Sequence, residues 1–421
     1  MSFQLPQFVA GTLLALGAAS GVQAATITIA CGSNAADLEF CGKYAEEWGT
    51  KNGHTVKLYT PPASTTDNLA LMRQQFAAKS SDLDVLLVDV VWPGVIKDHL
   101  VDLKKYSKGA EAKHFPAIVA NNTVDGKLLA MPFFTDAGLL FYRKDLAEKY
   151  GLKAPGTWDE FAAAAKKVQD GERAAGSADF QGFVFQAKAY EGLTCDALEW
   201  VASFDGGAII DAKGNVTINN AKAAKALDTA ASWIGTIAPG GVLNYGEEDA
   251  RGVFQNGKAM FMRNWPYAWS LSQAADSPIK GKVGIAPLPA GAGGKNSATL
   301  GGWQLAVSKY SKNQDVAAQL VMYMTSTEIQ RKRAIGGSYN PTVMELYKDK
   351  EVVAANPFMG QLLDVFTGAV ARPATVTGLK YPEVSQAFWD ATHDVLSKKS
   401  TGADALKKLE GKLKQIKRDK W

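Results

Sequence analysis

The sequence predicts an α/β protein of two lobes, and three observations support this fold class. Strand and helix patterns alternate over the first 90 residues, as in a parallel sheet covered by helices on both faces. A second block with the same alternation follows further along the chain. Two segments between the blocks, 131–136 and 286–302, look like crossings rather than parts of either lobe. Several crossings between two lobes place a cleft between them, beyond the carboxyl ends of the strands.

The first block contains three strand patterns separated by two helical patterns. TITIA and TVKLY favour strands, and the nearly continuous apolar run LDVLLV indicates a buried strand. The predicted strands are 26–30, 55–59 and 83–88, and the predicted helices are 36–51 and 67–79.

The second block begins with a helix in FYRKDLAEKYG, for which Gly151 is the stop signal. TWDE at 157–160 is a capping box that opens the next helix. At the far end, Leu406, Leu409, Leu413 and Ile416 recur at helical spacing, which predicts an amphipathic helix packed on a lobe with a solvated lysine face. Further strands are predicted at 183–187, 259–262, 282–286 and 303–307.

Length and composition indicate an ordinary globular protein. The 421 residues are 47% hydrophobic and 21% charged, and at roughly 100–200 residues per domain they suggest about two domains. The net charge of +4 comes from 46 basic and 42 acidic side chains mixed along the chain, so we expect no nucleic-acid partner.

The amino-terminal run FVAGTLLALGAASGVQA predicts an export signal at residues 1–24, cleaved before Ala25, although no Lys or Arg precedes the run. The run is too short to span a membrane, so we expect a soluble, exported mature protein. In an oxidising compartment Cys31 and Cys41 could form a local disulfide, or both could remain buried thiols. Cys195 is left over and is expected to be buried.

Signatures of catalysis are missing from the sequence. The four histidines form no HExxH pair, and no G-x-S-x-G motif occurs. GAGGKNS resembles a phosphate-binding loop but has Pro289 and Asn296 at two fixed positions. We therefore predict no catalytic residue, no metal and no cofactor.

Carboxylates and aromatic side chains instead follow the predicted strands. Each has a simple structural explanation alone, as a helix-terminus charge, a core side chain or a solvated loop residue. Together they describe a cleft for a sugar, whose ring faces lie on aromatic rings and whose hydroxyls need donors and acceptors. In RNWPYAWSL, Pro266 keeps the segment out of a helix, so its aromatic rings can face a ligand. These candidates are Glu39, Asp89, Asp136, Trp265, Tyr267, Trp303 and Arg372.

Long ordered segments carry a resemblance to a known family. They include KSSDLDVLLVDVVWPG, FTDAGLLFYRKDLAEKYG, YEGLTCDALEW, RNWPYAWSL, SPIKGKVGIAPLP and ATLGGWQLAVSKYS. The sequence resembles the extracytoplasmic sugar-binding components of ABC importers, in the group that includes maltose-binding proteins, and looks closest to its trehalose/maltose-binding branch.

The resemblance implies a two-lobe periplasmic-binding-protein fold without catalytic activity. It implies one lobe at 25–134 plus 288–337 and another at 138–286 plus 340–421, with hinges near 134–137, 286–289 and 336–341. Its site would use Glu39, Asp89 and Asp136 for sugar hydroxyls, Trp265, Tyr267 and Trp303 for the rings, the backbone of Gly302, and Arg372 from the far lobe.

Two departures bear on the ligand. Phe134 stands where thermophilic relatives are expected to have a tyrosine, and Asn68-Leu69 occupies a region where they carry arginines. The function hypothesis is a monomeric periplasmic protein that captures an α-linked disaccharide of the trehalose, maltose and sucrose class by hinge closure and delivers it to a membrane permease. The alternatives are a receptor for a monosaccharide, polyol or modified sugar, and a secreted glycoside hydrolase using two of the three carboxylates.

Overall fold

The computed structural model describes residue 1, residues 24–361 and residues 363–421. The predicted export signal falls almost entirely outside these residues. The strands are β1 (Thr26–Ala30), β2 (Thr55–Tyr59), β3 (Val85–Asp89), β4 (Thr123–Val124), β5 (Lys127–Leu128), β6 (Met131–Ala137), β7 (Leu139–Arg143), β8 (Gln181–Val184), β9 (Ala259–Asn264), β10 (Val283–Ala286) and β11 (Leu300–Val307).

The α-helices are α1 (Ala35–Asn52), α2 (Thr65–Ala77), α3 (Lys104–Ser107), α4 (Pro116–Asn122), α5 (Lys144–Lys149), α6 (Trp158–Ala174), α7 (Glu191–Ser203), α8 (Ala221–Trp233), α9 (Glu247–Gln255), α10 (Ala268–Ser272), α11 (Gln314–Met324), α12 (Thr327–Gly337), α13 (Lys350–Ala355), α14 (Pro357–Gln361), α15 (Leu363–Thr367), α16 (Ala374–Thr377), α17 (Tyr381–Leu396) and α18 (Gly402–Lys417). Short 3-10 helices are η1 (Lys97–His99), η2 (Ala110–Lys113), η3 (Gly240–Asn244), η4 (Met344–Lys348) and η5 (Gly378–Lys380).

The first lobe is built on a sheet with the strand order β2-β1-β3-β11-β6. Strand β1 is parallel to β2 and β3, as the alternation of strands and helices predicts. Strand β11 runs antiparallel to both β3 and β6, a direction that the sequence did not predict. The reason is topological, because β11 returns to this sheet after the chain has built the second one.

Helices cover both faces of the first sheet. Along β3, Val85 and Leu87 pack against α1 and α11, whereas Leu86 and Val88 pack toward α2. Successive side chains of a strand point to opposite faces, so a strand buried on both faces needs an uninterrupted apolar run. This explains the sequence VLLV.

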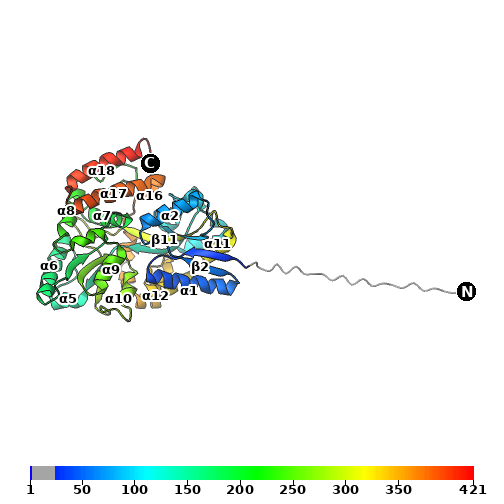
Figure 1. Cartoon of the computed structure of the whole chain (residues 1–421), viewed down its shortest axis with the longest axis horizontal. Helices are drawn as coiled ribbons and strands as arrows, with labels where there is room; N and C mark the ends of the chain where they lie inside the picture. The colour runs from blue at the N-terminus through cyan, green and yellow to red at the C-terminus, as the bar shows by residue number, and fades with distance from the viewer. Residues whose placement is uncertain (2–23, 362) are drawn as a thin grey trace.

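The second lobe is built on a sheet with the order β10-β7-β9-β8, in which only β8 and β9 run parallel among the described strands. Aromatic rings fill its core, with Phe161, Phe183 and Trp233 in mutual contact. Helix α6 begins at the predicted capping box, which Thr157 and Glu160 form. In Figure 1 this lobe, with α5, α6 and α8, lies to the left of the lobe that carries α1 and α2.

The backbone crosses between the sheets at two clear points. Segment 131–136 was predicted to be a crossing, but it is buried and belongs to β6 of the first sheet, so that prediction is wrong. The crossing is Gly138, between β6 and β7. The return crossing runs from β10 to β11 and is shorter than predicted, because 300–302 already pair in β11. The lobe boundaries and the hinge at 336–341 remain predictions; within that hinge, Asn340 pairs with Thr135 of β6.

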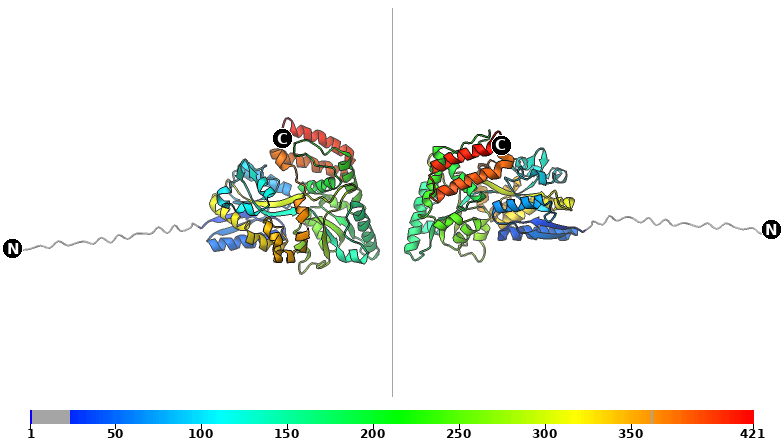
Figure 2. Two further views of the ribbon diagram at one scale, coloured as in Figure 1. Left: turned by 180° about the vertical axis from the view of Figure 1, so that it is seen from behind. Right: turned by 45° about the horizontal axis from the view of Figure 1, so that its top comes forward.

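The carboxyl-terminal helix α18 packs on α17 and α8, on the outside of the second lobe (Figure 2). Leu406, Leu409 and Leu413 are buried, which confirms the predicted amphipathic helix, and most of its lysines are exposed. No helix among residues 24–361 and 363–421 combines the length and apolar character that crossing a bilayer requires.

Candidate ligand-binding cavity

A cavity of about 230 Å³ lies between the two lobes. The first lobe contributes residues at the ends of β1, β3 and β6 and the start of β11. The second lobe contributes the starts of α7 and α9 and the segment after β9. Of the predicted site residues, those that line it are Asp89, Asp136, Trp265, Tyr267, Gly302, Trp303 and Arg372.

Glu39 is the predicted site residue that the structure does not bring to the cavity. Its side chain is exposed on α1, whereas Asp37, two positions earlier, is buried and lines the cavity. Two positions correspond to about 200° around a helix, so Asp37 and Glu39 point to opposite sides of α1. The prediction of Glu39 therefore placed the cavity carboxylate two residues, or about half a helical turn, too far along α1.

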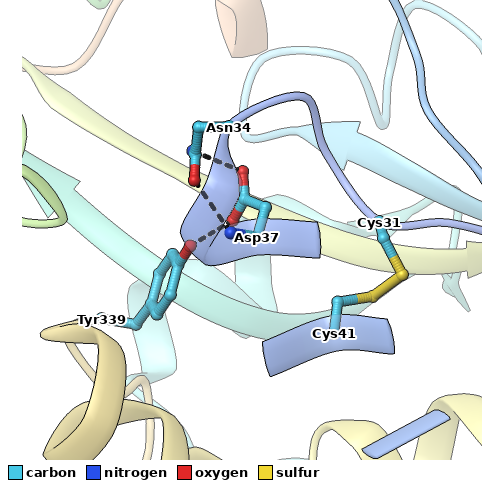
Figure 3. The surroundings of a disulfide bond; sticks show 5 residues. All are labelled: Cys31, Asn34, Asp37, Cys41 and Tyr339. Atoms are coloured by element: carbon cyan, nitrogen blue, oxygen red, sulfur yellow. Dashed lines mark hydrogen bonds between the residues drawn. A yellow bond between two sulfur atoms is a disulfide. The ribbon is translucent and has the colours of Figure 1, made fainter. Parts of the chain in front are cut away.

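Asp37 is held by contacts around the start of α1 (Figure 3). Asn34 caps the helix: its Oδ1 accepts a hydrogen bond from the Asp37 N–H at 2.8 Å, and its Nδ2 donates to Asp37 Oδ2 at 2.7 Å. The Tyr339 hydroxyl donates to the other carboxylate oxygen. Cys31 and Cys41 are joined in a disulfide that ties α1 to the end of β1. The carboxylate position is therefore fixed by several independent contacts.

Asp136 and Asp37 are two buried carboxyl groups facing one cavity. Burial and the negative charge of Asp37 raise the pKa of Asp136 to about 8, although the charges of Arg263 and Arg333 act in the opposite direction. Burial outweighs the hydrogen bond from Tyr339, which acts in the opposite direction, so that the pKa of Asp37 is raised to about 6. Near pH 7 the pair therefore offers both an acceptor and a carboxylic-acid donor.

The segment after β9 supplies aromatic rings to the cavity. Trp265 is half-buried, and its Nε1 donates to Glu247 Oε1 at 3.4 Å. Tyr267 is buried and its hydroxyl donates to Glu248 Oε1 at 2.5 Å. Pro266 lies between them, before the short helix α10 begins. The prediction that Pro266 keeps this segment out of a helix therefore fails for its second half, because α10 begins two residues after the proline, although Trp265 and Tyr267 both lie before the helix and line the cavity.

Trp303 and Gly302 enter the cavity from β11. The Trp303 ring meets Trp92 edge to face, with centroids 5.6 Å apart. Gly302 has a φ of +118°, and a Cβ atom there would lie 2.6 Å from the Phe134 carbonyl oxygen. A residue with a side chain would therefore displace β11 from β6 at this point.

Arg372 joins the lobes through buried ion pairs. Its Nη2 lies 3.0 Å from Asp89 Oδ1 on β3, and its Nη1 lies 2.7 Å from Glu191 Oε1 on α7. Tyr381 and Ser385 donate further hydrogen bonds to Glu191. Arg372 and Asp89 were both expected to bind a sugar, but in this structure they bind each other.

The cavity also contains polar residues that the sequence analysis missed. Glu247 and Glu248 occupy the first turn of α9, where acidic side chains have an ordinary role at a helix terminus. Tyr190 donates to Glu247 Oε2 at 2.6 Å from the neighbouring helix start. The acidic run after Gly246 is the one signal that could have indicated them. The departures noted in the sequence, Phe134 and Asn68, line the cavity as well.

The chemistry of the cavity is that of hydrogen bonding and ring contact. Across the described ranges, no three His, Cys, Asp or Glu side chains are grouped so that they could hold a metal ion. The free thiol of Cys195 is buried at the cavity wall, and burial raises its pKa well above the usual value. A thiol in that state is a poor nucleophile.

Comparisons with known proteins match nearly the whole chain. A family model described as bacterial extracellular solute-binding protein matches residues 35–331. A probable ABC transporter-binding protein of Deinococcus radiodurans is 56% identical over 415 residues, covering 98% of this chain and 99% of that protein.

Solved structures agree with this match. Maltose-bound MalE3 of T. maritima is 42% identical, with a TM-score of 0.88 over 93% of this chain and 100% of that chain. A solute-binding protein of Agrobacterium vitis with bound D-mannitol is 25% identical, with a TM-score of 0.80 over 93% of this chain and 98% of that chain.

Proposed function

Because the chain belongs to the family of bacterial extracellular solute-binding proteins, we propose that it captures an α-linked disaccharide of the maltose, trehalose and sucrose class. Its fold is the two-lobe periplasmic-binding-protein fold. The proposed protein is periplasmic and monomeric, carries out no chemistry on its ligand, and delivers it to the permease of an ABC importer.

The observation that carries the proposal is the combination of groups in one cavity. The indole of Trp265 offers a flat apolar surface, and Asp37 and Asp136 offer carboxyl oxygens beside it. A pyranose needs both, because its ring faces carry C–H groups and its edge carries hydroxyls. Hydrogen bonds to charged groups contribute about 1.5–3 kcal/mol each. A few of them together with ring contact support a binding free energy of about −8 kcal/mol, which corresponds to a micromolar Kd. The 42% identical relative that holds maltose supports this ligand class.

Capture by closure follows from the position of the cavity. Its walls come from both lobes, so a ligand reaches all of its partners only when the lobes are together. A ligand that binds the closed state better than the open state shifts the population toward closure. Hinge closure is a known behaviour of periplasmic binding proteins. The proposed hinges are those predicted near 134–137, 286–289 and 336–341.

One observation favours a second candidate, a receptor for a monosaccharide or polyol. The cavity volume of about 230 Å³ lies below the roughly 300–1,000 Å³ of pockets for larger ligands. The mannitol-bound relative is consistent with a smaller ligand. A few polar substitutions are enough to change the preferred sugar, because an unpaired hydroxyl partner is costly.

Isothermal titration calorimetry of the protein from Ala25 onward tests the proposal. The ligands are maltose, trehalose, sucrose, glucose and mannitol. We expect saturable one-to-one binding of a disaccharide with a micromolar Kd. Trp265→Ala should weaken it at least tenfold, whereas Trp269→Phe, in the same segment but outside the cavity, should not.

Two results would decide against the disaccharide. Tighter binding of glucose or mannitol than of every disaccharide would select the second candidate. Release of glucose from maltose on prolonged incubation would instead show a hydrolase, for which two carboxyl groups of raised pKa are also suited.

A further inference from the structure

A buried cluster lies directly behind the aromatic wall of the cavity. We define the Arg263 cluster as Arg263, Asp196, Glu199 and Gln186. Arg263 is 2% exposed, and its guanidinium carbon lies 3.9 Å from the centroid of the Trp265 ring. Its planar group therefore covers one face of the indole whose ring lines the cavity.

The guanidinium orientation is fixed by three neighbours. Arg263 Nε donates to Glu199 Oε2 at 2.9 Å and Nη2 donates to Glu199 Oε1, a paired arrangement. Nη1 donates to Gln186 Oε1 at 3.1 Å, and Asp196 Oδ1 lies 3.0 Å from Nε. Burial alone would lower the pKa of Arg263, but Asp196 and Glu199 raise it, so the group stays charged.

A purely structural role explains this cluster poorly. Burying ions costs several kcal/mol each, and well-packed apolar side chains of the same volume are often as stable or more so. An apolar side chain, however, makes no hydrogen bonds, so it would not be fixed in one orientation against the Trp265 ring. The Arg263 cluster supplies such bonds on one face of Trp265.

The cluster also contacts both clear crossings between the lobes. Glu199 Oε1 accepts a hydrogen bond from the Thr299 N–H at 3.1 Å, at the end of the return crossing. At the other crossing, a Cβ atom on Gly138 would lie 2.0 Å from Glu199 Oε1 and 2.5 Å from Arg263 Nη2. Both crossings thus pack against the group that supports the ring.

We propose that Arg263 is a positioning residue that holds the Trp265 indole in its ligand-binding orientation and links that orientation to the two interlobe crossings at Gly138 and Thr299. The ligand side of this inference rests on the proposed function, because Trp265 is taken there as the surface for a sugar ring. Arg263 itself touches no ligand in this account.

The test uses Arg263→Lys, which keeps the charge but loses the planar group and its paired bonds. The matched control is Arg143→Lys, since Arg143 is also a buried arginine of the second sheet, paired with Asp145, but lies outside the cavity. Both proteins are labelled with 5-fluorotryptophan, and the ¹⁹F resonance of Trp265 is identified by its loss in Trp265→Phe. We expect Arg263→Lys to shift or broaden this resonance and Arg143→Lys to leave it unchanged. An unchanged resonance in Arg263→Lys would overturn the inference.

A double-mutant cycle on the Kd for the best disaccharide separates positioning from general stability. Arg263→Lys should weaken binding about tenfold in the wild-type background, as expected if only about a tenth of the molecules then hold the indole in its ligand-binding orientation, and less than twofold in Trp265→Ala. Equal losses in both backgrounds would show that Arg263 does not act through Trp265. If Arg263→Lys does not fold, Gln186→Ala takes its place, with a smaller shift of the same resonance expected and an unchanged resonance contradicting the inference. If the wild type binds no sugar, the proposed function fails, while the resonance still decides the role of Arg263.

Discussion

At the scale of single residues, the two buried carboxyl groups of Asp37 and Asp136 are the main polar features of the cavity wall. Both have raised pKa values, mainly because they are buried, and both lie where a ligand hydroxyl could reach them. Such perturbed groups in a cavity are typical of functional sites. Their ionisation also affects folding, which gives a test that needs no ligand.

We expect Asp136→Asn to stabilise the protein increasingly as pH rises from 4 to 8. The pKa of Asp136 is raised from 3.8 to about 8, so its stabilising contribution is fully present below pH 4 and is lost as pH rises through 8. Asparagine carries no such loss. Thermal unfolding should give nearly equal melting temperatures for the two proteins at pH 4.

Above pH 8 the variant should be more stable, by on the order of several kcal/mol, because each pKa unit corresponds to about 1.4 kcal/mol. Comparing variant with wild type at each pH cancels the titration of groups that do not interact with Asp136. A difference in melting temperature that does not change between pH 4 and pH 9 would contradict the assignment.

Asp37 and Glu39 form a matched pair for testing the cavity. Asp37→Asn should weaken ligand binding at least tenfold, because a charged acceptor of a hydroxyl is lost. Glu39→Gln should leave binding within twofold, since Glu39 is exposed and outside the cavity. Titration of both variants against the same sugar gives the comparison. The opposite ranking would restore Glu39 as the binding residue.

These residues also show which positions of the site can be predicted from the sequence and which cannot. Asp89 was located at the end of a predicted strand, Asp136 in a predicted crossing and Trp303 after a pair of glycines, and all three line the cavity. Asp37 was missed because choosing between two carboxylates two positions apart requires the exact start of a helix. The pairing of Arg372 with Asp89 joins residues 283 positions apart, which no local pattern reports.

At the scale of elements, the start of α1 is the most constrained part of the site. The disulfide joins Cys31 after β1 to Cys41 within α1, and Asn34 caps the helix between them. This arrangement holds Asp37 toward the cavity and Tyr339. Closing a loop of this length removes freedom mainly from the unfolded chain.

Replacing both Cys31 and Cys41 by serine should lower the free energy of unfolding by about 3 kcal/mol, as loop closure over some ten residues predicts. Denaturant unfolding measures this loss. Ligand binding should weaken as well, because the first turn of α1 becomes looser. The control is reduction of the wild type, which should reproduce the effect, while the double variant should not respond to reductant. Equal stability of oxidised and reduced wild type would contradict the prediction.

Helices and strands were predicted correctly where the signal lies within one short segment of sequence. They were missed where the signal depends on pairing with a strand far away in the sequence. VLLV indicates a strand buried on both faces, and TWDE indicates a helix start, from local sequence alone. MPFFTD was not recognised as β6, because its partner β11 lies more than 160 positions later. The antiparallel direction of β11 was missed for the same reason.

At the scale of the whole molecule, a ligand between the lobes should make the protein more compact. The cavity walls come from both lobes, and Arg372 already bridges β3 and α7. Small-angle scattering should show a smaller radius of gyration with saturating ligand than without it. Arg372→Met should increase the radius of the ligand-free protein, because the bridge between the lobes is lost. An unchanged radius on ligand addition would count against hinge closure.

A crystal structure of the protein grown with saturating maltose would show directly whether the cavity between the lobes is the sugar-binding site. We predict one disaccharide in the cavity, with a sugar ring on the Trp265 face opposite Arg263 and hydroxyls within hydrogen-bond distance of Asp37 and Asp136. Maltose bound elsewhere, or an empty cavity in crystals grown with maltose, would show that this cavity is not the disaccharide site.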